Sequence, residues 1–148
     1  MRVAFAADHA GWPLRARIFD EMAAGGHEVV DCGSSEPVPG DDYPDAAAAG
    51  AAAITAGRAE RGILVCGSGV GAGVAANKVV GIRASMCHDS FSARQGVEDD
   101  NMNVLCLGAR VIGVELAAEL VRDYLGARFS GAERHRRRLG KIAAMERR

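Results

Sequence analysis

Short, unbroken apolar runs alternate with helical segments along this chain, and that order constrains the fold more than any other feature. The runs cover residues 3–7, 28–32, 62–66, 82–87 and 104–107. Helical segments are predicted at 13–24, 46–56, 74–78, 90–97, 114–125 and 134–147. Strands that are apolar throughout indicate burial on both faces, and strand–helix alternation indicates parallel pairing. The order predicts an α/β fold with a five-stranded parallel sheet and helices on both faces.

The length, charge and cysteine content of the chain narrow its class. Its 148 residues fit one domain, 1–148, and its formal net charge of −1 gives no global field that would favour nucleic acid. The four cysteines have neither C-x-x-C spacing nor a zinc pattern, which favours free thiols in a reducing compartment. Asp8 comes too early for a signal peptide, and no apolar run approaches the ~20 residues of a membrane helix. We expect a cytoplasmic protein that binds neither nucleic acid nor a membrane.

A glycine stretch follows the third apolar run directly. Glycine occupies every second position from Gly67 to Gly73. Repeated glycine lets backbone N–H groups turn toward one point, and the helix that follows adds its positive end, so the stretch could hold an oxyanion. A tight strand-to-helix turn is the alternative, although four glycines exceed what one turn needs. Residues 67–72 also match the dinucleotide pattern G-x-G-x-x-A, with Asp89 about 20 residues further on, but this match follows the third strand rather than the first.

Cys66 ends the third apolar run and stands directly before the glycine stretch. A thiol beside backbone N–H donors and the start of a helix is more readily deprotonated, so Cys66 could remove a proton from a substrate carbon or attack as a nucleophile. An ordinary buried cysteine is the alternative. We assign Cys32, Cys87 and Cys106 to that second class.

Asp8, His9 and Arg110 also follow strands, and a parallel sheet binds ligands beyond the carboxyl ends of its strands. Asp8 and His9 follow the first strand and could hydrogen-bond a sugar. Alternatively, Asp8 caps the start of a helix and His9 has no functional role. Arg134 and Arg138 share one helix face and could clamp a phosphate, unless the helix is merely a solvated basic one. No aromatic residues interleave with this basic run, so a nucleic-acid role is disfavoured.

Together these motifs resemble the family of ribose-5-phosphate isomerase type B and galactose-6-phosphate isomerase. The matching motifs cover nearly the whole chain: Asp8-His9-Ala10-Gly11, Asp42-Tyr43-Pro44, Cys66-Gly67-Ser68-Gly69-Val70-Gly71, Ala75-Ala76-Asn77-Lys78, Gly81-Ile82-Arg83-Ala84, Asn103-Val104-Leu105, Gly108-Ala109-Arg110 and Arg134-His135. The resemblance implies a Rossmann-like three-layer sandwich in a homodimer or homotetramer, with sites shared between subunits and a C-terminal helix, about 134–147, that reaches a neighbour. It implies aldose–ketose isomerisation of a sugar phosphate, most simply ribose 5-phosphate, without metal or cofactor.

The resemblance also implies roles for individual residues. Cys66 would take the proton from the carbon beside the carbonyl, and Ser68 would assist proton movement between the two substrate oxygens. The glycine loop would stabilise the enediolate, while acid, histidine and arginine side chains would hold the sugar and its phosphate. The expected substrate-binding residues are Asp8, His9, Gly67, Gly69, Val70, Gly71, Asp100, Arg110, Arg134 and Arg138.

Asp99 departs from the family pattern. It stands where the family commonly carries the histidine that helps to open the sugar ring, and we keep it as a candidate catalytic residue. Ring opening could then depend on Asp99 itself or on His88 or His9. The preferred substrate could also be a tetrose or hexose phosphate; a tetrose phosphate is already open. Two further classes of protein stay open. One is a regulatory module on a receiver-like fold, which would require an aspartate at the position of Cys66. The other is a dinucleotide- or ligand-binding module.

Overall fold

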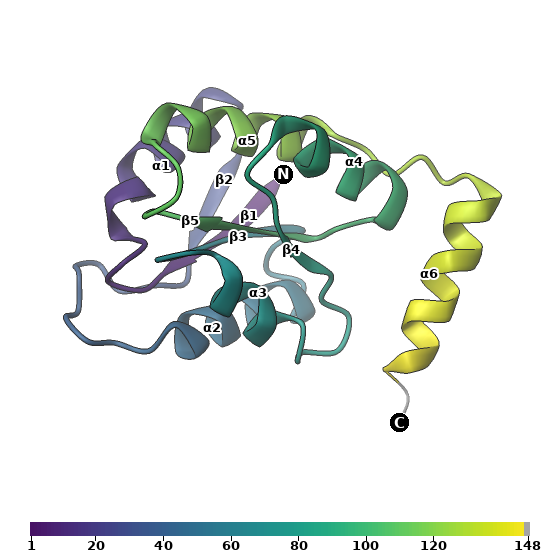
Figure 1. Ribbon diagram of the computed structural model, residues 1–148, viewed down its shortest axis with the longest axis horizontal. Coiled ribbons are helices and arrows are strands. Elements are labelled where there is room, and N and C mark those ends of the chain that lie inside the picture. Colours follow the sequence, from purple (N-terminus) through teal and green to yellow (C-terminus); the bar gives the residue numbers. More distant parts are fainter. Residues whose placement is uncertain (147–148) are drawn as a thin grey trace.

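The computed structural model describes residues 1–146 and is built around a sheet of strand order β2-β1-β3-β5-β4 (Figure 1). The strands are β1 (Arg2–Ala7), β2 (Glu28–Asp31), β3 (Arg61–Cys66), β4 (Ala84–Met86) and β5 (Val104–Gly108). All four neighbouring pairs of this sheet are parallel. The predicted five-stranded parallel sheet is therefore confirmed for this part of the chain.

Helices cover both faces of the sheet and complete the predicted three layers (Figure 1). They are the short 3-10 helix η1 (Trp12–Leu14) and the α-helices α1 (Arg15–Ala24), α2 (Tyr43–Thr55), α3 (Val70–Ala76), α4 (Ser90–Asp100), α5 (Val114–Gly126) and α6 (Glu133–Met145). One face carries α1, α4 and α5, and the other carries α2 and α3. None of the helices described is both long and apolar enough to cross a bilayer.

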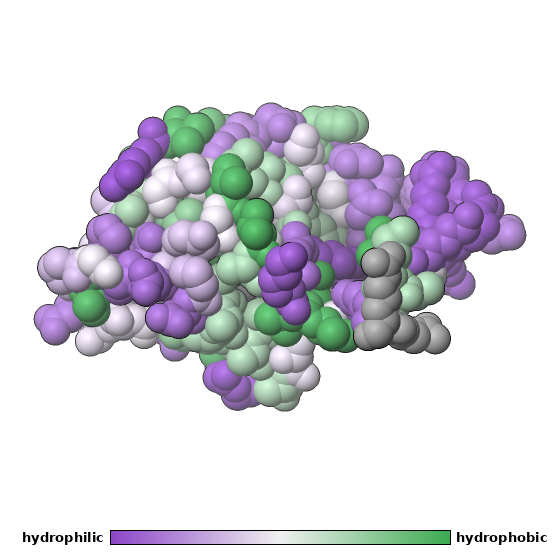
Figure 2. Space-filling view, turned by 60° about the horizontal axis from the view of Figure 1, so that its bottom comes forward, coloured by the Kyte–Doolittle hydropathy of each residue, from purple (hydrophilic) through white to green (hydrophobic). Residues whose placement is uncertain are grey.

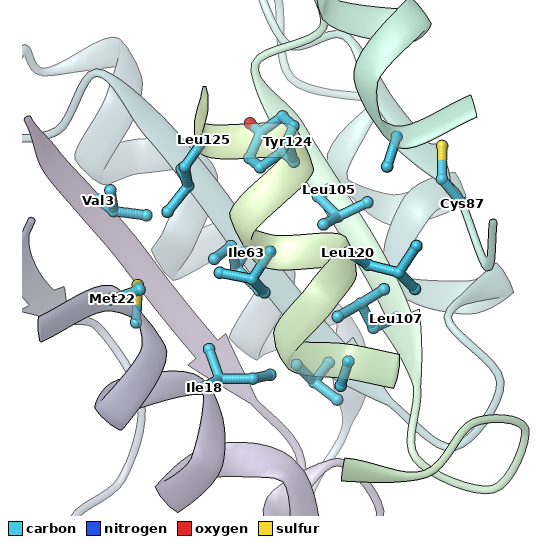
Figure 3. Packing of buried hydrophobic residues seen from close by; sticks show 14 of the residues in the cluster. Val3, Ile18, Met22, Ile63, Cys87, Leu105, Leu107, Leu120, Tyr124 and Leu125 are labelled. Carbon is cyan, nitrogen blue, oxygen red and sulfur yellow. The ribbon is translucent and has the colours of Figure 1, made fainter. Parts of the chain in front are cut away.

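Side chains of the central strands alternate between two cores, as the two-residue period of a strand requires. Ile63 and Val65 of β3 face the core under α1, α4 and α5, which is shown in Figure 3. Leu64 and Cys66 face the alanine-rich core under α2 and α3. Because both faces are buried, β3 is apolar throughout, and Cys66 at its carboxyl end points toward the α2–α3 layer.

Several predicted boundaries are wrong by a few residues. The helix predicted to start at residue 74 starts at Val70, so the glycine loop proper ends at Gly69. Glycine is a poor helix former, and the sequence pattern therefore delayed the start of the helix. Packing requires glycine inside this helix, since a Cβ at Gly71 would lie only 2.7 Å from the ring of Tyr43. Likewise β4 is shorter than the predicted 82–87 run, α2 begins earlier than 46, and α4 continues to Asp100.

The last helix, α6, stands apart from the three layers (Figure 1). Its start is anchored by His135, which is buried, and its far end by Glu146, whose Oε1 accepts a hydrogen bond from the Gly81 N–H at 3.1 Å. Ile142 and Met145 between these anchors remain exposed. The predicted helix extended to residue 147, which lies outside the described residues.

Candidate active site

The carboxyl ends of β1, β3 and β5 open into one pocket of about 330 Å³. Ligands bind at this edge of open parallel sheets. The lining residues are Asp8, His9, Ala10, Tyr43, Cys66, Gly67, Ser68, Gly71, Arg110 and Val111. The structure thus brings together seven residues that the sequence had singled out, from three separate segments of the chain.

Cys66 lies at the floor of this pocket and is only 4% exposed. Its Sγ accepts a hydrogen bond from the Gly69 N–H at 3.2 Å, and the Ser68 Oγ accepts one from the Val70 N–H at 3.2 Å. Gly69 adopts φ +82, a left-handed conformation that turns the chain back toward the sulfur. The N–H groups of Gly69 and Val70 thus hold the side chains of Cys66 and Ser68, and neither Gly69 nor Val70 is among the residues that line the pocket.

Asp8 is 6% exposed and shapes the turn after β1. Its Oδ1 accepts a hydrogen bond from the Gly11 N–H at 2.9 Å. The turn lies so close to β3 that a Cβ at Gly11 would sit 2.2 Å from the Val65 carbonyl oxygen. Asp8 does not cap a helix, because the cap position of η1 is Gly11. Its carboxylate instead closes this turn through the bond from Gly11.

His9 is held by Asp41, a residue that the sequence analysis missed. One oxygen of Asp41, Oδ1, accepts from the His9 backbone N–H at 2.8 Å and lies 2.7 Å from the ring Nδ1. Burial opposes ionisation of Asp41, but the bonds from His9 outweigh that effect and lower the pKa of this carboxyl. The two residues are 32 positions apart, and Asp41 lies in a turn-rich loop, so no local pattern marked the pair. Tyr43, Ala10 and Val111 also line the pocket without a predicted role.

Among residues 1–146, one cluster has potential metal-ligand geometry: Asp8, His9 and Asp41, whose ligand atoms lie within 4.8 Å of one another. Two carboxylates and an imidazole are donors that a divalent cation accepts. The short contact between His9 and Asp41 already pairs two of the three donors.

The acid of the dinucleotide pattern has a structural task. The Asp89 Oδ1 accepts a hydrogen bond from the Ser92 N–H at 2.7 Å and caps α4, and hydrogen bonding with Ser92 lowers the pKa of the Asp89 carboxyl.

Burial raises the pKa of the Cys106 thiol to about 12, and burial also raises the pKa of the Cys87 thiol. Both are buried as expected, whereas Cys32 is only half-buried.

Four predicted site residues lie away from this pocket: Asp99, Asp100, Arg134 and Arg138. The Gly62 N–H donates to the Asn103 carbonyl at 2.8 Å, which places the segment after α4 beside the start of β3. Cys66 lies four residues further along β3, about 13 Å at the rise of a strand. Asp99 and the start of α6 therefore lie near the amino ends of the strands, whereas Cys66 lies at the carboxyl end of β3.

Asp99 and Arg134 form part of a second polar cluster. The Gln95 Nε2 donates to the Asp99 Oδ2 at 2.7 Å, and the other Asp99 oxygen lies 3.5 Å from the Nδ1 of His135. The Nε of Arg134 donates to the Nε2 of His135 at 3.1 Å. A larger groove of about 730 Å³ runs between α6 and the body, and of the predicted site residues it includes only Asp100.

Comparisons with known proteins agree on one family. A family model described as Ribose/Galactose Isomerase matches residues 3–142. Ribose-5-phosphate isomerase B of Escherichia coli (strain K12) is 42% identical over 99% of this chain and 97% of its own length. D-erythrulose-4-phosphate isomerase of Pectobacterium atrosepticum is 43% identical over 88% of this chain and 86% of its own. The solved structure of Clostridium thermocellum ribose-5-phosphate isomerase B has a TM-score of 0.94 at 41% identity, covering 99% of this chain and 98% of that one.

Proposed function

Because this chain belongs to the ribose/galactose isomerase family, we propose that it interconverts the aldose and ketose forms of a phosphorylated sugar, with ribose 5-phosphate and ribulose 5-phosphate as the first pair to test. The observation that carries the proposal is the pocket itself. It holds a thiol, a hydroxyl, an imidazole and a guanidinium within about 330 Å³, at the edge where such sheets bind ligands. Free thiols at all four cysteines support a location in the reducing cytoplasm.

Cys66 is the proposed base. As a thiolate it takes the proton from C2 of the open aldose; the C–H electron pair forms the C1–C2 double bond, and the carbonyl electrons move to O1. Ser68 passes a proton between O1 and O2, after which Cys66 returns its proton to C1. Arg110 is the cation of this pocket and suits the negative charge of the enediolate or the phosphate. Electrons stay within the substrate, so the reaction needs no external oxidant.

The site is proposed to be completed by a second copy of the chain. Four of the predicted site residues lie near the amino ends of the strands, away from the pocket: Asp99, Asp100, Arg134 and Arg138. A neighbouring subunit must therefore supply them if they are to reach the substrate. Arg134 and Arg138 are four residues apart on α6 and exposed, which suits paired contacts to a phosphate. A homodimer, or a homotetramer built from it, satisfies this requirement.

The surface beside α6 supports such an assembly. β4 is an edge strand with one side unpaired in the sheet. Figure 2 shows hydrophobic residues near α3 and β4 and hydrophilic ones over the projecting start of α6. Exposed apolar side chains on α3, β4, α6 and the start of α4, and on the connection between α3 and β4, include Val70, Val74, Val80, Met86, Phe91, Ile142 and Met145. A subunit seated here would cover them and occupy the groove.

Subunit mixing tests the shared site. Cys66→Ser and Arg138→Ala subunits should each be weakly active alone, the second through a raised KM. Refolding them together in equal amounts should restore about a quarter of wild-type activity, because half of the dimers are hybrids and each hybrid has one intact site. Mixtures no more active than the separate variants would refute the shared site. Wild-type protein without pentose phosphate turnover would refute the proposed reaction.

A tetrose phosphate is the second candidate substrate. Asp99 replaces the expected ring-opening histidine, and one relative is named D-erythrulose-4-phosphate isomerase. An aldose of four carbons with its phosphate on the last oxygen cannot close a five-membered ring, so it needs no ring opening. The ratio of kcat/KM for erythrose 4-phosphate to that for ribose 5-phosphate decides between the two candidates.

A further inference from the structure

Ribose 5-phosphate exists mainly as a closed furanose, and its ring must open before C2 can lose a proton. This inference rests on the proposed function and concerns which group of the site performs that step. We propose that His9 opens the sugar ring and that Asp41 positions the His9 imidazole for it.

The other histidines are engaged elsewhere. His88 accepts the Gly108 N–H at 3.0 Å through its Nε2, and burial lowers its pKa. His135 is 3% exposed and contacts Ser130 and Arg134. His27 precedes β2 at the opposite edge of the sheet and lies beside the N-terminal amine. Of the four histidines in the chain, His9 alone lines the pocket, with a side chain 39% exposed.

Asp41 determines which nitrogen of His9 is free. An ionised carboxylate only accepts hydrogen bonds, so the Nδ1 at 2.7 Å from the Asp41 Oδ1 carries the proton. The neutral ring then has its lone pair on Nε2, the nitrogen that can act as a base. The bond from the His9 backbone N–H to the same oxygen, at 2.8 Å, fixes the carboxylate as well as the ring. Two donors on one oxygen hold the imidazole in a single orientation and tautomer.

The free Nε2 suffices for the whole step. It takes the proton of the O1 hydroxyl, the O–H electrons form the C1=O bond, and the C1–O4 electrons move to the ring oxygen. The imidazolium then gives its proton to O4, which completes the C4 hydroxyl and regenerates the neutral ring. Because O1 and O4 are bonded to the same carbon, one nitrogen can serve both in turn. No second acid at position 99 is required.

The test compares a closed substrate with an open one. Ribulose 5-phosphate cannot form a furanose, because its terminal oxygen carries the phosphate. Exchange of its C1 proton with D₂O therefore reports Cys66 chemistry without ring opening. Asp41→Asn should lower kcat on ribose 5-phosphate by about 10–100-fold, the usual effect of losing a residue that orients a histidine. The same variant should leave the C1 exchange rate of ribulose 5-phosphate nearly unchanged.

Asp42→Asn is the matched control, since this neighbouring acid is exposed and makes no side-chain cap bond to α2. It should leave both rates unchanged, and Asp41→Glu should recover part of the ring-opening rate. Nitrogen NMR of His9 should show the Nδ1–H tautomer in the wild type and a mixture in Asp41→Asn. Equal losses on both substrates, or a wild-type rate on ribose 5-phosphate in Asp41→Asn, would overturn the proposal. A wild-type protein that exchanges neither sugar would instead overturn the proposed function.

Discussion

Replacing Cys66 with serine isolates its chemistry from its structural role. The Cys66 Sγ is the acceptor for the buried Gly69 N–H at 3.2 Å, so alanine would leave that donor unpaired at a cost of about 1–3 kcal/mol. Serine keeps an acceptor oxygen at the same place and is expected to change the free energy of unfolding by less than about 1 kcal/mol. A hydroxyl in place of a thiolate is a far weaker base at neutral pH.

The expected loss is kinetic. Removal of a general base costs about 10²–10⁴-fold in rate, so kcat of Cys66→Ser should fall by that factor while KM changes little. Coupled turnover of ribose 5-phosphate measures the overall rate, and C1 proton exchange of ribulose 5-phosphate in D₂O measures the abstraction step. Urea unfolding of Cys66→Ser and Cys66→Ala separates a loss of catalysis from a loss of stability. A serine variant that exchanges the C1 proton at the wild-type rate would refute the assignment of Cys66.

Three further predictions follow from the structure. Gly11→Ala would put a Cβ 2.2 Å from the Val65 carbonyl oxygen and should destabilise the protein by about 1–3 kcal/mol in urea unfolding, with no loss if the turn relaxes freely. Arg61→Met removes guanidinium bonds to the carbonyls of Tyr124 and Ala127 at the end of α5 and should cost about 2 kcal/mol by the same assay, whereas wild-type stability would show these bonds to be dispensable. The pKa of Cys106 is raised from 9.0 to about 12, so the unfolded chain loses this proton first, and stability should fall by up to about 1.4 kcal/mol per pH unit between these values. Cys106→Ala should flatten that decline in urea titrations at several pH values, and an unchanged slope would contradict the reasoning.

The sheet was predictable because its strands carry their own signal. Each central strand is buried on both faces, so its residues are apolar without interruption, and the alternation with helices dictates parallel pairing. Positions directly after the strands then identified Asp8, His9, Cys66 and Arg110 as neighbours. Helix starts were less predictable. The low helix propensity of glycine delayed the predicted start of α3, whereas glycine at position 71 leaves room for the ring of Tyr43, a residue from a distant segment.

Local patterning alone determined the fold class and identified most of the pocket residues that directly follow strands. Hydrophobic periodicity and the ends of strands are properties of short segments, so a sequence pattern can reveal them. The tertiary structure decided what depends on contacts between distant segments. The pairing of Asp41 with His9 joins residues 32 positions apart, and no periodicity encodes it. The separation of Asp99 from Cys66 likewise depends on the direction of α4 across the sheet. That direction sets the two residues at opposite ends of the strands, although the family resemblance assigns both to one active site.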